Sequence, residues 1–158
     1  IDPNNEAIQF IINEVQWSYL IVFFILFFLG GYLLYSGLMA AIGAAVDEEA
    51  DTQQFLLPLT VPMVFAILMA SKVIDNPSSS LAFWLSEIPF TSPIIMIVRI
   101  AMGIGDSSVE IWEIILSLFL LSITFIGTTW LSGKIYRKGI LSYGKKASYS
   151  DLFKWLKN

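Results

Sequence analysis

The chain has 158 residues, of which 56% are hydrophobic, 15% aromatic and only 14% charged, with a formal net charge of −4. A soluble domain carries about 25% charged residues, so this composition excludes an ordinary water-soluble globule, and it excludes a disordered chain as well. The absence of Cys and His excludes disulfides, thiol chemistry, the Ser-His-Asp triad and nearly every catalytic zinc site. With no basic stripe for nucleic acid, the remaining class is an all-α integral membrane protein.

The first residues combine a helix-starting pair with a short amphipathic pattern. Asp2-Pro3 suits a helix start, and Ile8, Ile11, Ile12 and Val15 recur on one helix face. We expect a short external helix at the membrane interface, leading into the first span. The chain opens without Met and without a signal peptide. We therefore expect it to be the C-terminal part of a longer polypeptide.

Three long runs without charged residues predict three membrane-spanning helices. The runs are Val15–Val46, Thr52–Ser71 and Ile114–Gly133, and a span needs about 20 mostly apolar residues. The first run would form a helix of roughly 48 Å at 1.5 Å per residue. Since the hydrocarbon core is about 30 Å thick, we expect this helix to tilt, protrude or kink, with the kink at Gly30-Gly31.

A stripe of small residues lies in the second half of the first span. Small residues four apart let helix backbones approach closely in a membrane. The pattern indicates either an interface with another subunit or packing within the chain, and both remain open. The residues are Gly37, Ala40, Ala41, Ala44 and Ala45.

An acidic segment, residues 47–54, connects the first two spans. It is either a solvated turn that caps the next helix or a docking element for a cytoplasmic partner. Its polar residues are Asp47, Glu48, Glu49, Asp51, Gln53 and Gln54. The span that follows contains Pro58 and Pro62, which remove two backbone donors and predict either a static kink or a hinge.

Residues 78–103 hold two apolar pieces that are each too short to cross a bilayer. Residues 81–85 and 94–102 are separated by the polar break Ser86–Pro93. Two short helices around a break bounded by Pro89 and Pro93 predict a re-entrant hairpin. A pair of helices lying at the interface is the alternative.

Glu87 and Arg99 are the charged residues of this hairpin. Charges embedded in a membrane are costly and are usually paired or line a pathway. They either pair with each other, form an exit gate together with Pro89 and Pro93, or extend to the lipid headgroups.

The distribution of Lys and Arg predicts the orientation. Seven of the nine follow the third span, which places the C-terminus in the cytoplasm. The hairpin is then external and residues 47–54 cytoplasmic. Glu110 and Glu113 begin the third span, where carboxylates favour the helix dipole. Near the end of the chain, Leu152–Leu156 interleaved with Lys154 predicts a second interfacial helix.

Several of these segments resemble a known family of membrane proteins. Gly43–Val46, the acidic segment ending in Thr52-Gln53-Gln54, the span with two prolines, and Pro89–Pro93 followed by Arg99 resemble the C-terminal half of an ABC exporter permease. The stretch Lys134–Lys146 is similar to the tail of the NatB-like sodium-extrusion permeases. The resemblance covers essentially the whole chain.

The resemblance implies a six-span permease with a large external domain after its first span. Residues 1–158 would be the C-terminal transmembrane half. Residues 17–46, 53–75 and 110–134 would be its last three spans, with 78–103 as the external re-entrant segment and 135–158 as the cytoplasmic tail. The location implied is the bacterial inner membrane.

The resemblance also implies the partners and the mechanism. The chain would not be an enzyme and would carry no cofactor, since ATP and Mg would bind a separate cytoplasmic ATPase of the NatA kind. A second permease half or copy would complete the pathway, which works by alternating access. Sodium efflux is the narrower expectation. Export of a drug or lipid, or a scaffold or sensor that transports nothing, are the alternatives.

Overall fold

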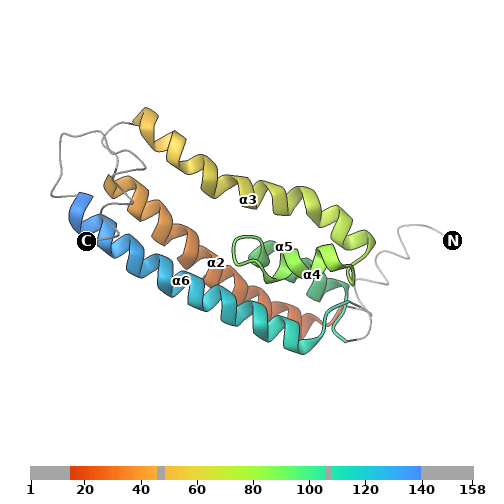
Figure 1. Ribbon diagram of the computed structural model, residues 1–158. Coiled ribbons are helices and arrows are strands. Elements are labelled where there is room, and N and C mark those ends of the chain that lie inside the picture. The colour runs from red at the N-terminus through yellow and green to blue at the C-terminus, as the bar shows by residue number, and fades with distance from the viewer. Residues whose placement is uncertain (1–14, 46–48, 106–107, 140–158) are drawn as a thin grey trace.

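The described part of the chain is built from helices and short connections (Figure 1). A computed structural model describes residues 15–45, 49–105 and 108–139. The helices are α2 (Trp17–Ala45), α3 (Glu49–Asp75), α4 (Ser80–Glu87), α5 (Ser92–Met102) and α6 (Ile111–Gly139). Within these ranges there is no strand, only an isolated bridge between Ile104 and Val109. The expected interfacial helices at the two ends of the chain lie outside the described residues.

The three long helices coincide with the three charge-free runs. Stretches long and apolar enough to cross a membrane lie at Trp17–Gly43, Gln53–Asp75 and Ile111–Ile135. Many of their large apolar side chains face outward, including Phe28 and Ile126, which are more than half exposed. That surface suits lipid rather than water. The prediction of an all-α membrane protein with three spanning helices is therefore confirmed.

Helices α2 and α6 pack through small residues. A Cβ added to Gly30 would lie 2.7 Å from Cδ2 of Leu121, and one added to Gly37 would lie 3.6 Å from Oγ1 of Thr129. Gly30 and Gly31, where we expected a kink, lie inside a helix assigned without interruption from Trp17 to Ala45. The pair serves close packing, because van der Waals contact rather than hydrophobicity drives association of helices in lipid.

The hairpin α4–α5 lies between α3 and the α2–α6 pair at one end of the bundle (Figure 1). Helix α5 contributes to both apolar clusters. Met96 and Ile100 pack in a cluster with residues of α2 and α6, and Ile95 packs in a cluster with residues of α3 and α4. Helix α5 is thus the element that ties α3 to the α2–α6 pair.

The acidic segment is helical earlier than we expected. Helix α3 begins at Glu49, so Glu49, Asp51, Gln53 and Gln54 belong to its first turns and not to a loop. Negative side chains near a helix N-terminus stabilise the helix dipole, which explains the early start. Asp47 and Glu48 lie outside the described residues, as do the side chains of Glu49 and Asp51.

Candidate functional site

The hairpin turn is built from the polar break between its two helices. Ser79 caps α4 by accepting a hydrogen bond from the backbone N–H of Ala82 at 3.2 Å. At the other end of α4, the hydroxyl of Thr91 donates to the carbonyls of Leu85 and Ile88. A proline in the first turn of α5 fits because that turn needs no backbone donor. The break is therefore a tight, internally bonded turn.

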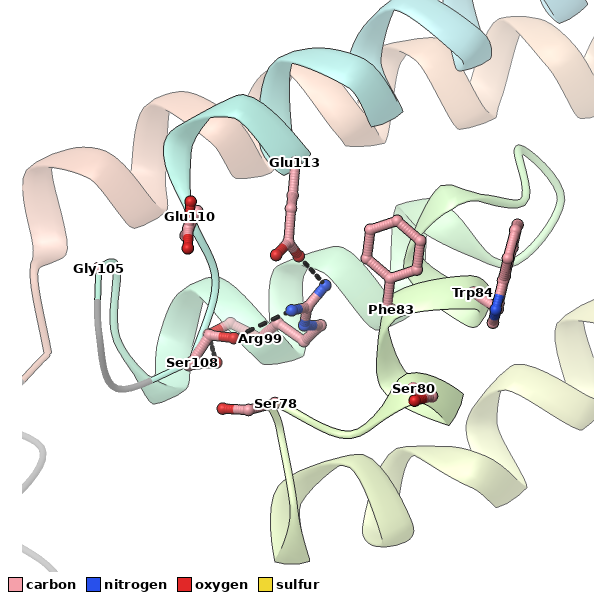
Figure 2. Close-up of a pocket in the computed structure, with 9 residues that line it drawn as sticks. All are labelled: Ser78, Ser80, Phe83, Trp84, Arg99, Gly105, Ser108, Glu110 and Glu113. Atoms are coloured by element: carbon pink, nitrogen blue, oxygen red, sulfur yellow. Dashed lines mark hydrogen bonds and ion pairs between the residues drawn. The ribbon is translucent and has the colours of Figure 1, made fainter.

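Arg99 is the centre of the polar network that holds the hairpin (Figure 2). Its side chain is only 2% exposed, and all three guanidinium nitrogens are engaged. Nε donates to the carbonyl of Pro77 at 2.9 Å, and Nη2 donates to that of Ser108 at 2.9 Å. Nη1 donates to the hydroxyl of Ser86 at 2.7 Å and forms an ion pair with Oε2 of Glu113 at 2.6 Å.

These contacts join five segments around one cation. Arg99 on α5 reaches the α3–α4 connection, the end of α4, the connection after α5 and the first turn of α6. Two further bonds reinforce the same junction. Ser108 Oγ donates to the carbonyl of Arg99 at 2.8 Å, and Ser117 Oγ on α6 donates to that of Ser86 at 2.6 Å. A buried charge is tolerated only when paired and hydrogen-bonded in this way.

The ion-pair partner of Arg99 is Glu113 and not Glu87. Of our alternatives for Arg99, pairing with Glu87 is therefore not formed among the described residues, and its burial excludes contact with the headgroups. From the sequence, Glu113 is interpreted mainly as a residue that stabilises the start of the third span. A buried arginine in an apolar helix is usually paired with a carboxylate. Glu113, in the first turn of α6, is the next carboxylate after Arg99 that lies within a helix. That preference could have indicated Glu113 from the sequence.

Glu87 lies in the last turn of α4 and has no hydrogen-bond partner for its side chain among the described residues. The residue is 5% exposed, and both of its carboxyl oxygens are buried with no hydrogen-bond partner. Burial, and to a smaller extent the charge of Glu113, raises the pKa of Glu87 to about 7, although Arg99 acts in the opposite direction. A negative charge is also unfavourable at a helix C-terminus.

A polar cavity opens beside Arg99 (Figure 2). Its volume is about 450 Å³. Arg99, Glu110 and Glu113 supply its charged groups, while Phe83 and Trp84 supply an aromatic wall from α4. The complete lining is Ser78, Ser80, Phe83, Trp84, Arg99, Gly105, Ser108, Glu110 and Glu113.

An apolar cleft lies on the other side of the hairpin turn. It has a volume of about 620 Å³ and runs between α2, the turn and Met63 of α3. The turn is fixed there because the hydroxyl of Tyr35 donates to the carbonyl of Phe90 at 2.8 Å. The lining is Phe24, Phe28, Gly31, Tyr32, Tyr35, Ser36, Met39, Met63, Phe90, Pro93 and Ile94.

The predicted exit-gate residues separate into these two surroundings. Arg99 lines the polar cavity, Pro93 lines the apolar cleft, and Pro89 is partly buried in the turn. Glu87 lines neither of these two spaces. The structure therefore brings Arg99 together with Glu113, Ser86 and Ser108, a set of partners that we did not predict as a group.

The predicted packing and docking residues lie elsewhere. Gly37 meets α6, Ala41 is buried and Ala40 is exposed, while the side chains of Ala44 and Ala45 are outside the described residues. Packing within the chain therefore explains part of the small-residue stripe. Gln53 and Gln54 are exposed near the start of α3, and the start of this helix lies at the end of the bundle away from the hairpin (Figure 1).

Comparison with known proteins places this arrangement in a family. The chain is 27% identical over 132 residues to the uncharacterized protein YhaP of Bacillus subtilis (strain 168), covering 84% of this chain and 30% of YhaP. It is 26% identical over 136 residues to the uncharacterized protein MJ1024 of Methanocaldococcus jannaschii, covering 86% of this chain and 33% of MJ1024. The chain thus spans about a third of the length of these curated relatives.

No solved structure matches the chain significantly. Residues 7–134 match the family described as ABC-2 family transporter protein. That match covers most of the chain and includes α2, α3, the whole hairpin and α6 as far as Lys134. The chain is a multi-pass membrane protein and belongs to the ABC-2 transporter family.

Proposed function

We propose that this chain is part of the membrane-spanning permease of an ATP-driven exporter. The observation that carries the proposal is the ABC-2 family match over residues 7–134, on a fold with three spanning helices and a packed hairpin. In this proposal, a separate cytoplasmic ATPase binds ATP and Mg, and a second permease half or copy completes the pathway. The segment 47–54 faces the ATPase.

The proposed orientation places the end of α6 on the cytoplasmic side of a bacterial inner membrane. Lys134 lies over the ring of Trp130, with its Nζ 4.5 Å from the ring centroid, and Arg137 follows as an exposed cation. An aromatic side chain next to cations is typical of the cytoplasmic membrane interface. The hairpin then belongs to the external half.

We also propose that the hairpin is re-entrant. Gly31 of α2 is so close to Pro93 that an added Cβ would lie 2.8 Å from its Cγ. Gly31 is about 20 Å along α2 from Trp17 at 1.5 Å per residue. A hairpin turn at that level lies inside the hydrocarbon region if α2 spans the bilayer. The internally bonded turn suits this depth, where unpaired backbone groups are costly.

The proposed mechanism is alternating access. The hairpin blocks the external end by packing between α3 and the α2–α6 pair. ATP-driven closure of the ATPases then moves the cytoplasmic ends of the spans, which lie away from the hairpin (Figure 1). The cleft beneath the hairpin turn is the space whose access would alternate.

Two cargo classes follow from two observations. Sodium is the cargo suggested by the similarity of Lys134–Lys146 to the tail of the sodium-extrusion permeases. A lipid or an apolar drug is the second candidate, because the walls of the cleft are almost wholly apolar. Apolar pockets with few polar groups are typical of sites for apolar ligands.

Reconstitution of the complete permease with its ATPase tests both the function and the cargo. Proteoliposomes would be loaded in parallel with radioactive sodium and with fluorescent lipid or dye. We expect ATP-dependent export of one of them and stimulation of ATP turnover by that cargo. An ATPase variant unable to hydrolyse ATP is the control. Copurification with an ATPase without any cargo-dependent turnover would contradict the exporter and favour the scaffold.

A pair of tryptophan variants on α3 tests the cleft. Met63→Trp would fill the apolar cleft, whereas Ile67→Trp would add the same volume to an exposed position of the same helix that does not line it. We expect M63W to reduce export at least several-fold and I67W to leave it unchanged. Equal export by both variants would show that cargo does not use this cleft.

A further inference from the structure

The buried charges of the hairpin do not balance. Arg99 supplies one positive charge, and two carboxyl groups, Glu113 and Glu87, lie near enough to influence each other's charge. Glu113 already forms the ion pair with Arg99 at 2.6 Å. If Glu87 were also ionised, the junction would hold one uncompensated negative charge. A buried unpaired charge is so costly that such a group normally takes up a proton instead.

The part of the chain that the structure describes offers Glu87 no other buried counter-charge. The charged groups that act on Glu87 are Arg99 of α5 and Glu113 of α6. Helix α3 contributes Lys72 and Asp75 in its last turns, and both are exposed. Glu110 before α6 is exposed as well, and α2 has no charged residue between Trp17 and Ala45. Both carboxyl oxygens of Glu87 are buried without a hydrogen-bond partner.

We propose that Glu87 is a proton-binding site that is occupied when the hairpin is seated as in this structure. Loss of the proton leaves a carboxylate that needs a cation, and the buried cation beside it is Arg99. Glu87 then competes with Glu113 for the guanidinium. Release of Glu113 weakens the bond between the hairpin and the first turn of α6. The proton itself leaves Glu87 for water.

The direction of the pH dependence follows from the pKa of Glu87. This pKa is about 7 in the seated hairpin, against an ordinary value of 4.5. The seated state therefore binds more protons than a state in which Glu87 is hydrated. The stabilisation of the seated state by the bound proton is complete below the ordinary pKa. It declines as the pH rises and is lost once the pH exceeds about 7. Raising the pH through neutrality should loosen the hairpin.

A proton is favoured over a metal cation by the same geometry. A monovalent or divalent metal ion requires several oxygen ligands around it. The oxygens of Glu87 have no polar partner within hydrogen-bonding distance among the described residues. A proton requires no ligand besides the carboxyl group that carries it.

Infrared difference spectroscopy of the complete permease in lipid nanodiscs tests the proposal directly. The carbonyl stretch of a protonated carboxylic acid is distinct from the bands of a carboxylate. We expect a protonated band that titrates near neutral pH, that is absent from Glu87→Gln, and that persists in Glu110→Gln. Glu110 is the matched control, because it is an exposed carboxylate close to the same junction. The readout does not depend on export, so it stands or falls separately from the proposed function.

A second variant tests whether the titrating group is coupled to the Arg99–Glu113 pair. Glu113→Gln removes the competitor and leaves Arg99 free to attract Glu87. We expect the midpoint of the titration to fall by about one pH unit or more, since a nearby cation favours the ionised carboxylate. An unchanged midpoint would show that the titrating group does not sense this pair.

Three outcomes would overturn the proposal. One is a protonated band that survives in Glu87→Gln. Another is a midpoint that Glu113→Gln leaves unchanged. The third is a Glu87 carboxylate that stays ionised and responds to added sodium chloride but not to choline chloride, which would make the residue a metal-ion ligand.

Discussion

The two ends of the bundle are held by different forces. At the hairpin end, α4, α5 and the first turn of α6 meet in a buried polar network around Arg99, in which every guanidinium nitrogen has a partner. At the open end, formed by residues 33–45 of α2 and 49–63 of α3, the hairpin does not lie between α2 and α3 (Figure 1), and the apolar cleft reaches Met39 and Met63 there. In lipid, apolar contacts give little net preference for another helix.

This difference indicates which end of the bundle is able to move. Buried hydrogen bonds and an ion pair have a narrow range of acceptable geometries, so they fix the hairpin end. Apolar surface can face lipid or protein at similar free energy, so the open end can separate or close at low cost. Helix α3 also lacks glycine, while α2 uses Gly30 and Gly37 to approach α6.

The largest expected effect is at Arg99. Arg99→Gln leaves the partly buried Glu113 without its cation. It also removes the side chain to which four other segments of the protein are bonded. Breaking one side of a buried ion pair costs about 3–5 kcal/mol. We expect the variant to lose most of its thermal stability in nanodiscs, as measured by unfolding with circular dichroism. Arg137→Gln, which changes an exposed cation at the far end of α6, should have little effect. Equal losses in both variants would remove the contrast between the two ends.

A glycine next to the hairpin turn should show the next largest effect. A methyl group at Gly31 would lie 2.8 and 2.9 Å from the Cγ and Cβ of Pro93, and the rigid proline ring has little freedom to move. We expect Gly31→Ala to destabilise the permease by about 1–3 kcal/mol through overpacking. In Gly127→Ala the added methyl meets nothing within 4 Å, so that variant should gain up to about 1 kcal/mol from helix propensity. A stable G31A would mean that α2 and the hairpin are not held at this distance.

The serine that joins α6 to α4 should have a smaller effect. Ser117 donates to the carbonyl of Ser86 at 2.6 Å inside the protein. Ser117→Ala removes this bond and should cost about 1 kcal/mol. Ser122→Ala, at an exposed position of the same helix, serves as the control in the same unfolding measurement. A cost no greater than that of the control would argue against a locked hairpin end.

At the open end, truncation should scarcely matter to stability. Met63→Ala removes a side chain that lines the cleft and is partly exposed. We expect a change within about 0.5 kcal/mol, as for surface positions without specific partners. A loss of several kcal/mol would show that the open end is as tightly packed as the hairpin end.

The sequence predicts the spans better than the contacts between them, for a physical reason. A helix that faces lipid must be long, apolar and free of charge, and those properties are visible in one dimension. The positions of α2, α3 and α6 follow from them. The hairpin follows in the same way from two short apolar pieces around Ser86–Pro93.

Contacts such as Arg99 with Glu113 depend on how the helices are arranged in space. Glu113 has a sufficient local role at a helix N-terminus, which concealed its second role as a counter-ion. Glu87 was visible as an embedded charge, but only the three-dimensional structure shows that the available cation is already paired. Gly30 and Gly31 suggest a kink from the sequence alone, and only the three-dimensional structure shows that they also allow close packing against Leu121 and Pro93.

The most direct test of the difference between the two ends is a pair of spin-label distances in the complete permease. One pair, Leu81 with Ile115, crosses the hairpin end between α4 and α6. The other, Met39 with Leu57, crosses the open end between α2 and α3. All four positions are exposed. The measurement is made in nanodiscs on the acidic side of pH 7, where Glu87 is protonated in our proposal, with and without the ATPase and a non-hydrolysable nucleotide.

We expect a narrow Leu81–Ile115 distance that the nucleotide does not change. The Met39–Leu57 distance should be broad and should shift when the ATPase binds nucleotide. A shift at the hairpin end with an unchanged open end would contradict the account.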